Sequence, residues 1–181
     1  MERDYQKNPF LHIESDRFPF PSANTSYGLK IMATFSQKEL EYLRGQQLGR
    51  IATVSRDQSP HVTPVAFASD EERLYLNIQH DSKKARNIRR NPRIQIVVDD
   101  FLSFEEFRGV LISGKAELIS SGKLHEIGRD LIYRKYPKYQ EQYPIQDGGW
   151  SKYILVITPT KIRSWGPLAK LRAKTQVPNY L

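Results

Sequence analysis

The sequence predicts a mainly β, α+β fold in which six or seven antiparallel strands form a barrel with two or three flanking helices. Apolar residues recur at every second position in several segments between residues 48 and 166, which is the period of a β-strand. The turn-forming sequence "RDQSP" separates the first two of these segments and indicates a hairpin. Few segments have helical spacing, and many strands with few helices favour a sheet that closes on itself.

A capping-box pattern marks the start of the first predicted helix. Ser36 and Glu39 stand three residues apart, and Leu40 and Leu43 follow at helical spacing. A serine and a glutamate at this spacing satisfy each other's free backbone N–H groups at a helix start. We therefore expect a helix over residues 36–46.

Seven segments are predicted to be strands. Alternation is clear in the fourth of them, where Ile94, Ile96 and Val98 fall on one face. The segment "YPKYQEQYPIQDGGW", residues 136–150, is predicted to be a loop. In chain order the predicted strands are residues 48–55, 61–69, 73–79, 93–100, 108–119, 153–159 and 161–166.

Two further helices are expected between these strands. Apolar residues at helical spacing predict one helix over residues 123–136. Asp81 or Ser82 is a suitable N-cap for the other, and the sequence "NP" ends it. This second helix covers residues 82–91 and directly follows a strand.

The periodicity and composition of the chain predict its domain organisation and its cellular location. Residues 1–34 have no clean period and are predicted to be an irregular N-terminal arm, whereas residues 35–181 form the domain. The sequence has no cysteine, no apolar run of about 18 residues and no apolar leader, so we expect a soluble cytoplasmic protein without a membrane partner. Its net charge of +8 favours anionic partners.

The stretch "HDSKKARNIRRNPR" carries six basic side chains, and two of them stand in an unusual place. Lys83 and Lys84 fall in the first turn of the predicted helix, although a helix N-terminus favours acidic groups. A bound phosphate would explain them, because free N–H groups and two ammonium groups would point at one anion. Solvated surface charge explains them equally well. No interleaved aromatics or known motif support a nucleic-acid contact, so no specific nucleic acid is expected.

The order of these pieces resembles the pyridoxamine-phosphate-oxidase-like family of flavin-binding split barrels. The resemblance runs over residues 36–166 through "GRIATVSRDQSPHVTPVAF", "LYLNI", "SKKARNIRRNPRIQIVV", "GVLISGKAELI" and "KIRSWG". It is closest to the branch that includes deazaflavin (coenzyme F-420) reductases. The resemblance implies a homodimer with two flavin-type cofactors between the subunits, either FMN or F-420. Haem is a further cofactor of the family, and no histidine placement favours it.

Nine residues match positions that contact the cofactor in the family. Three contact the phosphate, three lie along the flavin ring, and one hydrogen-bonds the ring edge or the ribityl chain. Another braces the helix turn at the phosphate, and the last reaches the cofactor from the partner subunit. Pro64 also fits an ordinary edge strand and Trp165 ordinary packing. In the order given, the nine are Ser82, Lys83 and Lys84; Thr63, Pro64 and Val65; Asn77; Asn87; and Trp165.

No nucleophile–base pair or metal-ligand spacing stands out, so neither a catalytic residue nor a metal site is predicted. The four histidines are scattered along the sequence, and we expect them to be structural or solvated. They are His12, His61, His80 and His125. This pattern fits flavin chemistry, in which the cofactor carries the reactive atoms. We therefore predict an oxidoreductase that moves hydride between FMN or deazaflavin and a small organic acceptor.

Two alternatives remain open from the sequence. The same fold can serve a non-enzymatic flavin-binding or stress-response protein, and a basic nucleic-acid-associated protein is the weaker alternative. Oxidation of pyridoxamine phosphate itself is not expected. The C-terminal "WGPLAKLRAKTQVPNYL" lacks the Arg-Leu-His substrate motif of those oxidases, and Thr63 stands where they carry a phosphate-binding arginine.

Overall fold

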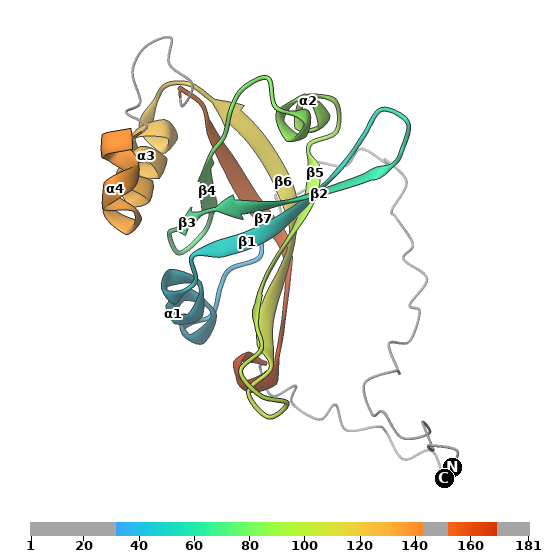
Figure 1. Cartoon of the computed structure of the whole chain (residues 1–181), viewed down its shortest axis with the longest axis vertical. Coiled ribbons are helices and arrows are strands. Elements are labelled where there is room, and N and C mark those ends of the chain that lie inside the picture. Colours follow the sequence, from blue (N-terminus) through green and yellow to red (C-terminus); the bar gives the residue numbers. More distant parts are fainter. Residues whose placement is uncertain (1–31, 143–151, 170–181) are drawn as a thin grey trace. The chain divides into compact units, whose positions relative to one another are not determined.

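The computed structural model describes residues 32–142 and 152–169. In these residues seven antiparallel strands form one curved sheet, and helices lie at its rims (Figure 1). The predicted fold class is therefore confirmed. The elements in chain order are α1 (Gln37–Gly45), β1 (Leu48–Val54), β2 (Pro60–Ala66), β3 (Ala68–Ser69), β4 (Leu74–Asn77), α2 (Lys83–Arg90), β5 (Arg93–Asp100), β6 (Arg108–Ile119), α3 (Lys123–Lys135), α4 (Pro137–Gln142), β7 (Ile154–Trp165) and the 3-10 helix η1 (Gly166–Leu168).

The sheet has the strand order β2-β1-β5-β6-β7-β4-β3, so one chain segment supplies both of its edges. β2 pairs with β1, and β3 pairs with β4, yet only Phe67 separates β2 from β3. The Tyr136 hydroxyl binds the backbone at this corner: it accepts from the N–H of Phe67 at 3.2 Å and contacts its carbonyl oxygen at 2.8 Å. The barrel thus closes at Phe67 and stays split along the rest of β2.

The core occupies both faces of the sheet. The larger cluster fills the inside of the barrel, and a smaller one lies under α3. Fully buried members of the inner cluster are Leu43, Phe67, Leu74, Leu76, Ala85, Ile96, Val98, Val110, Ile112, Leu155 and Ile157. The buried members of the outer cluster are Ala68, Tyr75, Ile132, Ile154 and Val156.

Several predicted elements are confirmed with little change in their bounds. The first helix begins with the expected capping box: Ser36 N–H donates to Glu39 Oε2 at 2.7 Å, and Glu39 N–H donates to Ser36 Oγ at 3.4 Å. β5 and β6 have the predicted bounds, because more and less buried residues alternate through most of both strands.

Three predictions of secondary structure were wrong. Residues 61–69 are not one strand, because the chain turns at Phe67 to a new neighbour. The two closing strands are one strand, β7, with a register shift opposite Ser113 and Gly114. The loop predicted from residue 136 contains α4, whose first residue is Pro137, a favourable residue at a helix start.

The predicted N-terminal arm, residues 1–34, lies outside the described residues except for its last three. There the N–H of Ala33 donates to the carbonyl of Pro159 at 3.1 Å. The end of the predicted loop, residues 143–150, also lies outside them. None of the helices in the described ranges has both the length and the apolar character that crossing a bilayer requires.

Gly128 lets α3 pack closely against the sheet. A Cβ atom at this position would lie 2.7 Å from Cδ1 of Tyr75 and 2.8 Å from Cγ2 of Ile154, and both side chains are fully buried. Gly45 is also helical, but a Cβ there would meet nothing within 4 Å.

We therefore expect opposite effects from the same substitution at these two glycines. Gly128→Ala should lower the free energy of unfolding by about 1–2 kcal/mol, because overpacking outweighs the gain in helix propensity. Gly45→Ala should leave stability unchanged or raise it by up to about 1 kcal/mol. Urea unfolding of both variants measures the difference, and equal stabilities would contradict the packing described for α3.

Candidate functional site

The start of α2 presents two lysines that form no ion pair among the described residues, although Asp57 of the β1–β2 turn lies close enough to Lys83 for the two charges to interact. Ser82 caps the helix: its Oγ accepts from the N–H of Ala85 at 3.3 Å and donates to the carbonyl of Gln79 at 2.8 Å. The first turn contains no acidic residue. Within the described part of the chain, neither Lys83 nor Lys84 makes a hydrogen bond or ion pair, and burial lowers the pKa of Lys84. The helix therefore begins with two unpaired cations.

His61 of β2 lies close enough to these lysines for their charges to change its pKa. Burial lowers the pKa of His61, and the positive charges of Lys83 and Lys84 lower it further. Two ammonium groups of α2 thus repel each other beside the His61 ring of β2, whose lowered pKa favours its neutral form. An anion such as a phosphate group would relieve this repulsion. The sequence interpretation left His61 outside the site, although the strand period places it on the same face as Thr63.

A buried polar network fixes the position of α2 against β1. Asn87 Nδ2 donates to Thr53 Oγ1 at 3.0 Å, and both residues are buried. Asn87 Oδ1 accepts from Arg90 at 3.1 Å, and Arg90 also donates to the carbonyl of Val54 at 2.9 Å. Thr53 Oγ1 lies 3.4 Å from Nδ1 of His61. Both ends of the Asn87 amide are thus bound by protein groups, so this residue holds the helix rather than facing a ligand.

The three predicted residues of β2 do not share one face. Thr63 and Val65 face the same side as His61, and Val65 is part of the inner core. Pro64 faces the other side, is exposed and pairs in register with Arg50 of β1. Because β2 is an edge strand, the missing N–H of proline leaves no ladder partner unsatisfied on the open side.

Besides Trp165, two of the predicted residues carry buried polar atoms with no hydrogen-bond partner among the described residues. They are Thr63, through Oγ1, and Asn77, through both Oδ1 and Nδ2. Asn77 is the last residue of β4, six positions before the start of α2. A buried polar group without a partner costs about 1–3 kcal/mol, so such groups require an explanation. A ligand bound between β2, β4 and α2 would supply the missing partners.

Trp165 lies at the other end of the sheet from these residues. It ends β7 and pairs with Gly109, whereas Ile154 begins β7 and pairs with Asn77. Twelve residues of strand span roughly 35 Å along the chain. Figure 1 shows α2 and η1 at opposite ends of the sheet. Within one chain, therefore, Trp165 does not join the other eight predicted residues.

The indole of Trp165 is held in place by its neighbours. A Cβ atom at Gly109 would lie 2.2 Å from the ring, so only glycine leaves room for it. The Phe107 ring lies beside it, with 5.9 Å between the ring centroids. Its Nε1 is buried without a hydrogen-bond partner in the described ranges.

The charge of the two lysines should be visible in the titration of His61. Replacing both by alanine should raise the pKa of His61, because one of the two causes that lower it is removed while burial remains. The measurement is the pH titration of the His61 ring signal by NMR. As a control with the same change in net charge, Lys38→Ala with Lys123→Ala should leave the pKa of His61 unchanged. An unchanged value in the first variant would show that the three groups are not neighbours.

Comparison with known proteins agrees with this architecture. A reductase of Streptomyces rimosus that acts on 5a,11a-dehydrotetracycline and 5a,11a-dehydrooxytetracycline is 43% identical over 94 residues, which cover 49% of this chain and 66% of the relative, just under two thirds of its length. A conserved hypothetical protein of Mycobacterium tuberculosis has a TM-score of 0.62 at 20% identity, over 78% of this chain and 90% of its own.

A FAD-binding protein of Mesorhizobium loti has a TM-score of 0.57 at 22% identity, over 74% of this chain and 94% of its own. At such identities the two solved structures show the shared fold alone. The model of the pyridoxamine 5'-phosphate oxidase family matches residues 35–166, which include all seven strands and all nine residues predicted to contact the cofactor. The chain belongs to the pyridoxamine 5'-phosphate oxidase family.

Proposed function

We propose that this protein binds a flavin-type cofactor by its phosphate at the start of α2 and transfers hydride between that cofactor and a small organic acceptor. The observation that carries the proposal is the pair of unpaired lysines, Lys83 and Lys84, at a capped helix start with the His61 ring beside them. FMN is the proposed cofactor and deazaflavin F-420 the alternative. The cysteine-free sequence supports a cytoplasmic location.

The residues of the site divide into binding and positioning groups. The ammonium groups of Lys83 and Lys84 and the free N–H groups of the first helical turn bind the phosphate, and His61 faces the same anion. Ser82 fixes the helix start, because its hydroxyl is already used by Gln79 and Ala85. A bound flavin would supply the hydride donor or acceptor.

Thr63 and Asn77 supply hydrogen bonds to the rest of the cofactor. Their unpartnered polar atoms support this role, since the flavin ring edge and the ribityl chain carry both donors and acceptors. Val65 supplies apolar surface beside them. The reductase of Streptomyces rimosus supports the direction of the reaction, reduction of the organic acceptor.

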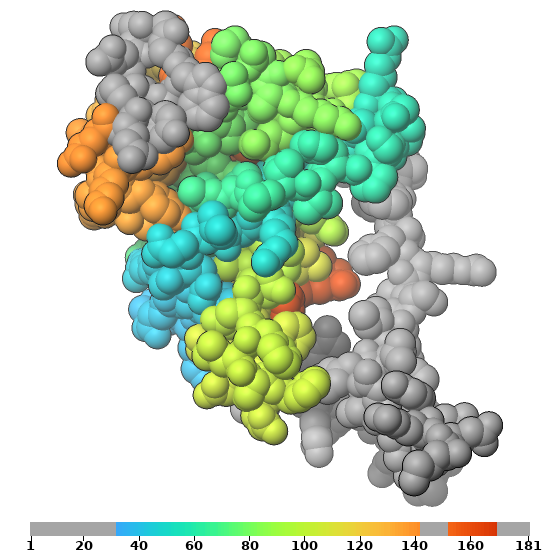
Figure 2. Space-filling model, viewed as in Figure 1, coloured from blue at the N-terminus to red at the C-terminus, as the bar shows by residue number. Residues whose placement is uncertain are grey.

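We also propose that two copies of the chain form the complete site. Trp165 reaches a cofactor only from a second subunit, because it lies at the far end of β7. Next to it, the loop between β5 and β6 exposes Phe101, Leu102 and Phe104 by 57%, 68% and 75%. Figure 2 shows this loop as a protruding lobe of the described part. Such apolar side chains on one loop favour a protein contact.

Removing the two lysines should weaken cofactor binding far more than folding. A hydrogen bond to a charged group contributes about 1.5–3 kcal/mol, so Lys83→Ala with Lys84→Ala should reduce the affinity for the correct cofactor about a hundredfold or more. Fluorescence titration with FMN and with F-420 measures the loss and identifies the tighter ligand. Riboflavin, which lacks the phosphate, should bind the variant and the parent equally.

The matched control is again Lys38→Ala with Lys123→Ala. Lys123 also stands in the first turn of a helix and is exposed, so this variant tests whether charge alone matters. It should bind the cofactor as the parent does. Parent-like binding by the Lys83, Lys84 variant would refute the phosphate site, and a cofactor that binds but never gives hydride to an acceptor would favour the non-enzymatic alternative.

The β5–β6 loop should determine the oligomeric state. Phe101→Asp with Phe104→Asp should shift a dimer toward monomer in sedimentation velocity, because burying two carboxylates in an apolar contact is costly. It should also weaken cofactor binding, although neither residue lies near α2. Leu48→Asp is the control, since Leu48 is as exposed as Phe101 but belongs to β1. A parent chain that sediments as a monomer at micromolar concentration would contradict the shared site.

A further inference from the structure

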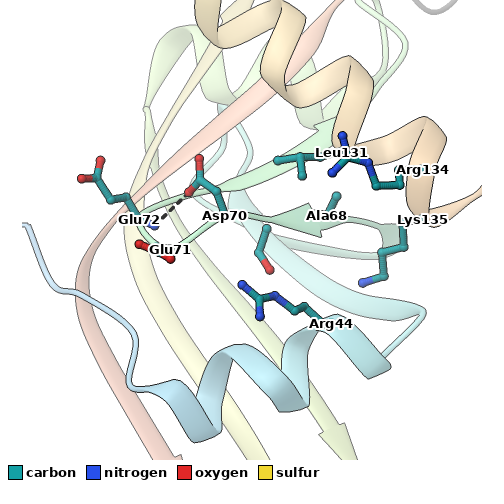
Figure 3. Close-up of a pocket in the computed structure, with 9 residues that line it drawn as sticks. Arg44, Ala68, Asp70, Glu71, Glu72, Leu131, Arg134 and Lys135 are labelled. Atoms are coloured by element: carbon teal, nitrogen blue, oxygen red, sulfur yellow. Dashed lines mark hydrogen bonds between the residues drawn. The ribbon is translucent and has the colours of Figure 1, made fainter.

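A cavity lies away from the proposed cofactor site and contains none of its residues. Its volume is about 680 Å³, which falls within the usual range for small-molecule pockets. Figure 3 shows it between α1, β3 and the end of α3. The lining includes Arg44 of α1, Ser69 of β3, the acidic β3–β4 turn, and Arg134 and Lys135 of α3.

The acidic and basic side chains of this cavity come from different sides. Figure 3 shows Arg44 on α1 and Arg134 and Lys135 on α3, while Glu71 and Glu72 lie on the turn between β3 and β4. Positive and negative groups thus line one cavity from opposite directions. A ligand with one sign of charge alone would meet repulsion from one of the two sides.

Two of the three acidic residues in the turn, and one basic residue of the lining, already bind other protein groups. Asp70 accepts from the N–H groups of Glu72 and Arg73 and from the Tyr75 hydroxyl. Glu72 forms an ion pair with Arg73 at 2.5 Å. In this turn Glu71 is left without a partner among the described residues.

Lys135 lines the same cavity, but its charge is bound by protein groups. Its Nζ donates to the carbonyl of Leu43 at 3.0 Å and lies 4.1 Å from the centroid of the Phe67 ring. Burial lowers the pKa of Lys135 to about 8. Arg44 and Arg134 make no such contacts in the described part of the chain and are exposed to the cavity.

Helix electrostatics explain only part of this arrangement. Basic residues in the last turns of α1 and α3 complement the helix dipoles, which accounts for their sequence positions. It does not account for two guanidinium groups from different helices that line one cavity. The hydroxyl of Ser69 is buried in the same wall without a hydrogen-bond partner among the described residues.

We propose that this cavity binds a small zwitterion, with its carboxylate at Arg44 and Arg134 and its ammonium group at Glu71. A guanidinium group matches the planar geometry of a carboxylate, which favours a carboxylate at the basic side. The side chains of Ala68 and Leu131 offer apolar surface for a short aliphatic linker. An ω-amino acid has this chemistry, with opposite charges at the two ends of a methylene chain.

Three probes of equal chain length test the proposal by calorimetric titration. 4-Aminobutyrate carries both charges, butyrate only the carboxylate and butylamine only the ammonium group. 4-Aminobutyrate should bind with a saturable, millimolar or tighter affinity, at least about tenfold tighter than either relative, because each charge-assisted contact contributes about a factor of ten or more.

Variants of the lining residues assign the contacts. Arg44→Gln with Arg134→Gln should abolish the advantage of 4-aminobutyrate over butylamine, and Glu71→Gln should abolish its advantage over butyrate. Arg129→Gln is the control, because Arg129 lies on α3, pairs with Asp130 and does not line the cavity. The Lys83→Ala, Lys84→Ala variant should bind 4-aminobutyrate as the parent does, which separates this site from the proposed cofactor site.

Three results would overturn the zwitterion site. They are the absence of saturable 4-aminobutyrate binding in the folded parent, equal binding of butyrate or butylamine, and parent-like binding by the arginine and glutamate variants. None of these results bears on whether the protein binds a flavin.

Discussion

The fold depends on one backbone constraint, the corner at Phe67. A continuous strand through residues 60–69 would pair with one neighbour, but here the chain leaves β1 and joins β4 within one residue. A corner inside a sheet exposes backbone groups that need partners, and the Tyr136 hydroxyl binds both the N–H and the carbonyl of Phe67. The edge that this corner leaves open along β2 is where His61 lies near the start of α2.

At that edge the chain keeps two like charges together. Lys83 and Lys84 lie in the first turn of α2, where a basic group is unfavourable for the helix dipole, and their charges lower the pKa of His61. The buried bond from Asn87 to Thr53 fixes α2 against β1. A positively charged site that is assembled before its ligand arrives loses less entropy on binding than one that must first be ordered.

The strands could be predicted from the sequence better than the corner at Phe67 and the candidate site. β5 and β6 were predictable because alternation runs through most of their length. The alternation of "HVTPVAFAS" also continues through Phe67, so no local signal distinguishes the corner there. Pro159 resembles a strand end, yet the register shift in β7 accommodates it. The helix-dipole argument singled out the phosphate residues Ser82, Lys83 and Lys84, and the other predicted cofactor residues came from the family resemblance. His61 and the cavity beside α3 depend on contacts between distant segments that no local pattern contains.

Three predicted cofactor residues, Thr63, Asn77 and Trp165, carry buried polar atoms without partners in the described ranges. Each such residue costs about 1–3 kcal/mol, against a total stability of about 5–15 kcal/mol for a domain. Bound cofactor would satisfy the first two within one chain, and a second subunit would bring Trp165 to the same ligand. Under both proposals, cofactor binding and dimerisation together give hydrogen-bond partners to the same set of buried polar groups. Thermodynamic linkage then requires each to strengthen the other, so the cofactor would bind the dimer more tightly than the monomer.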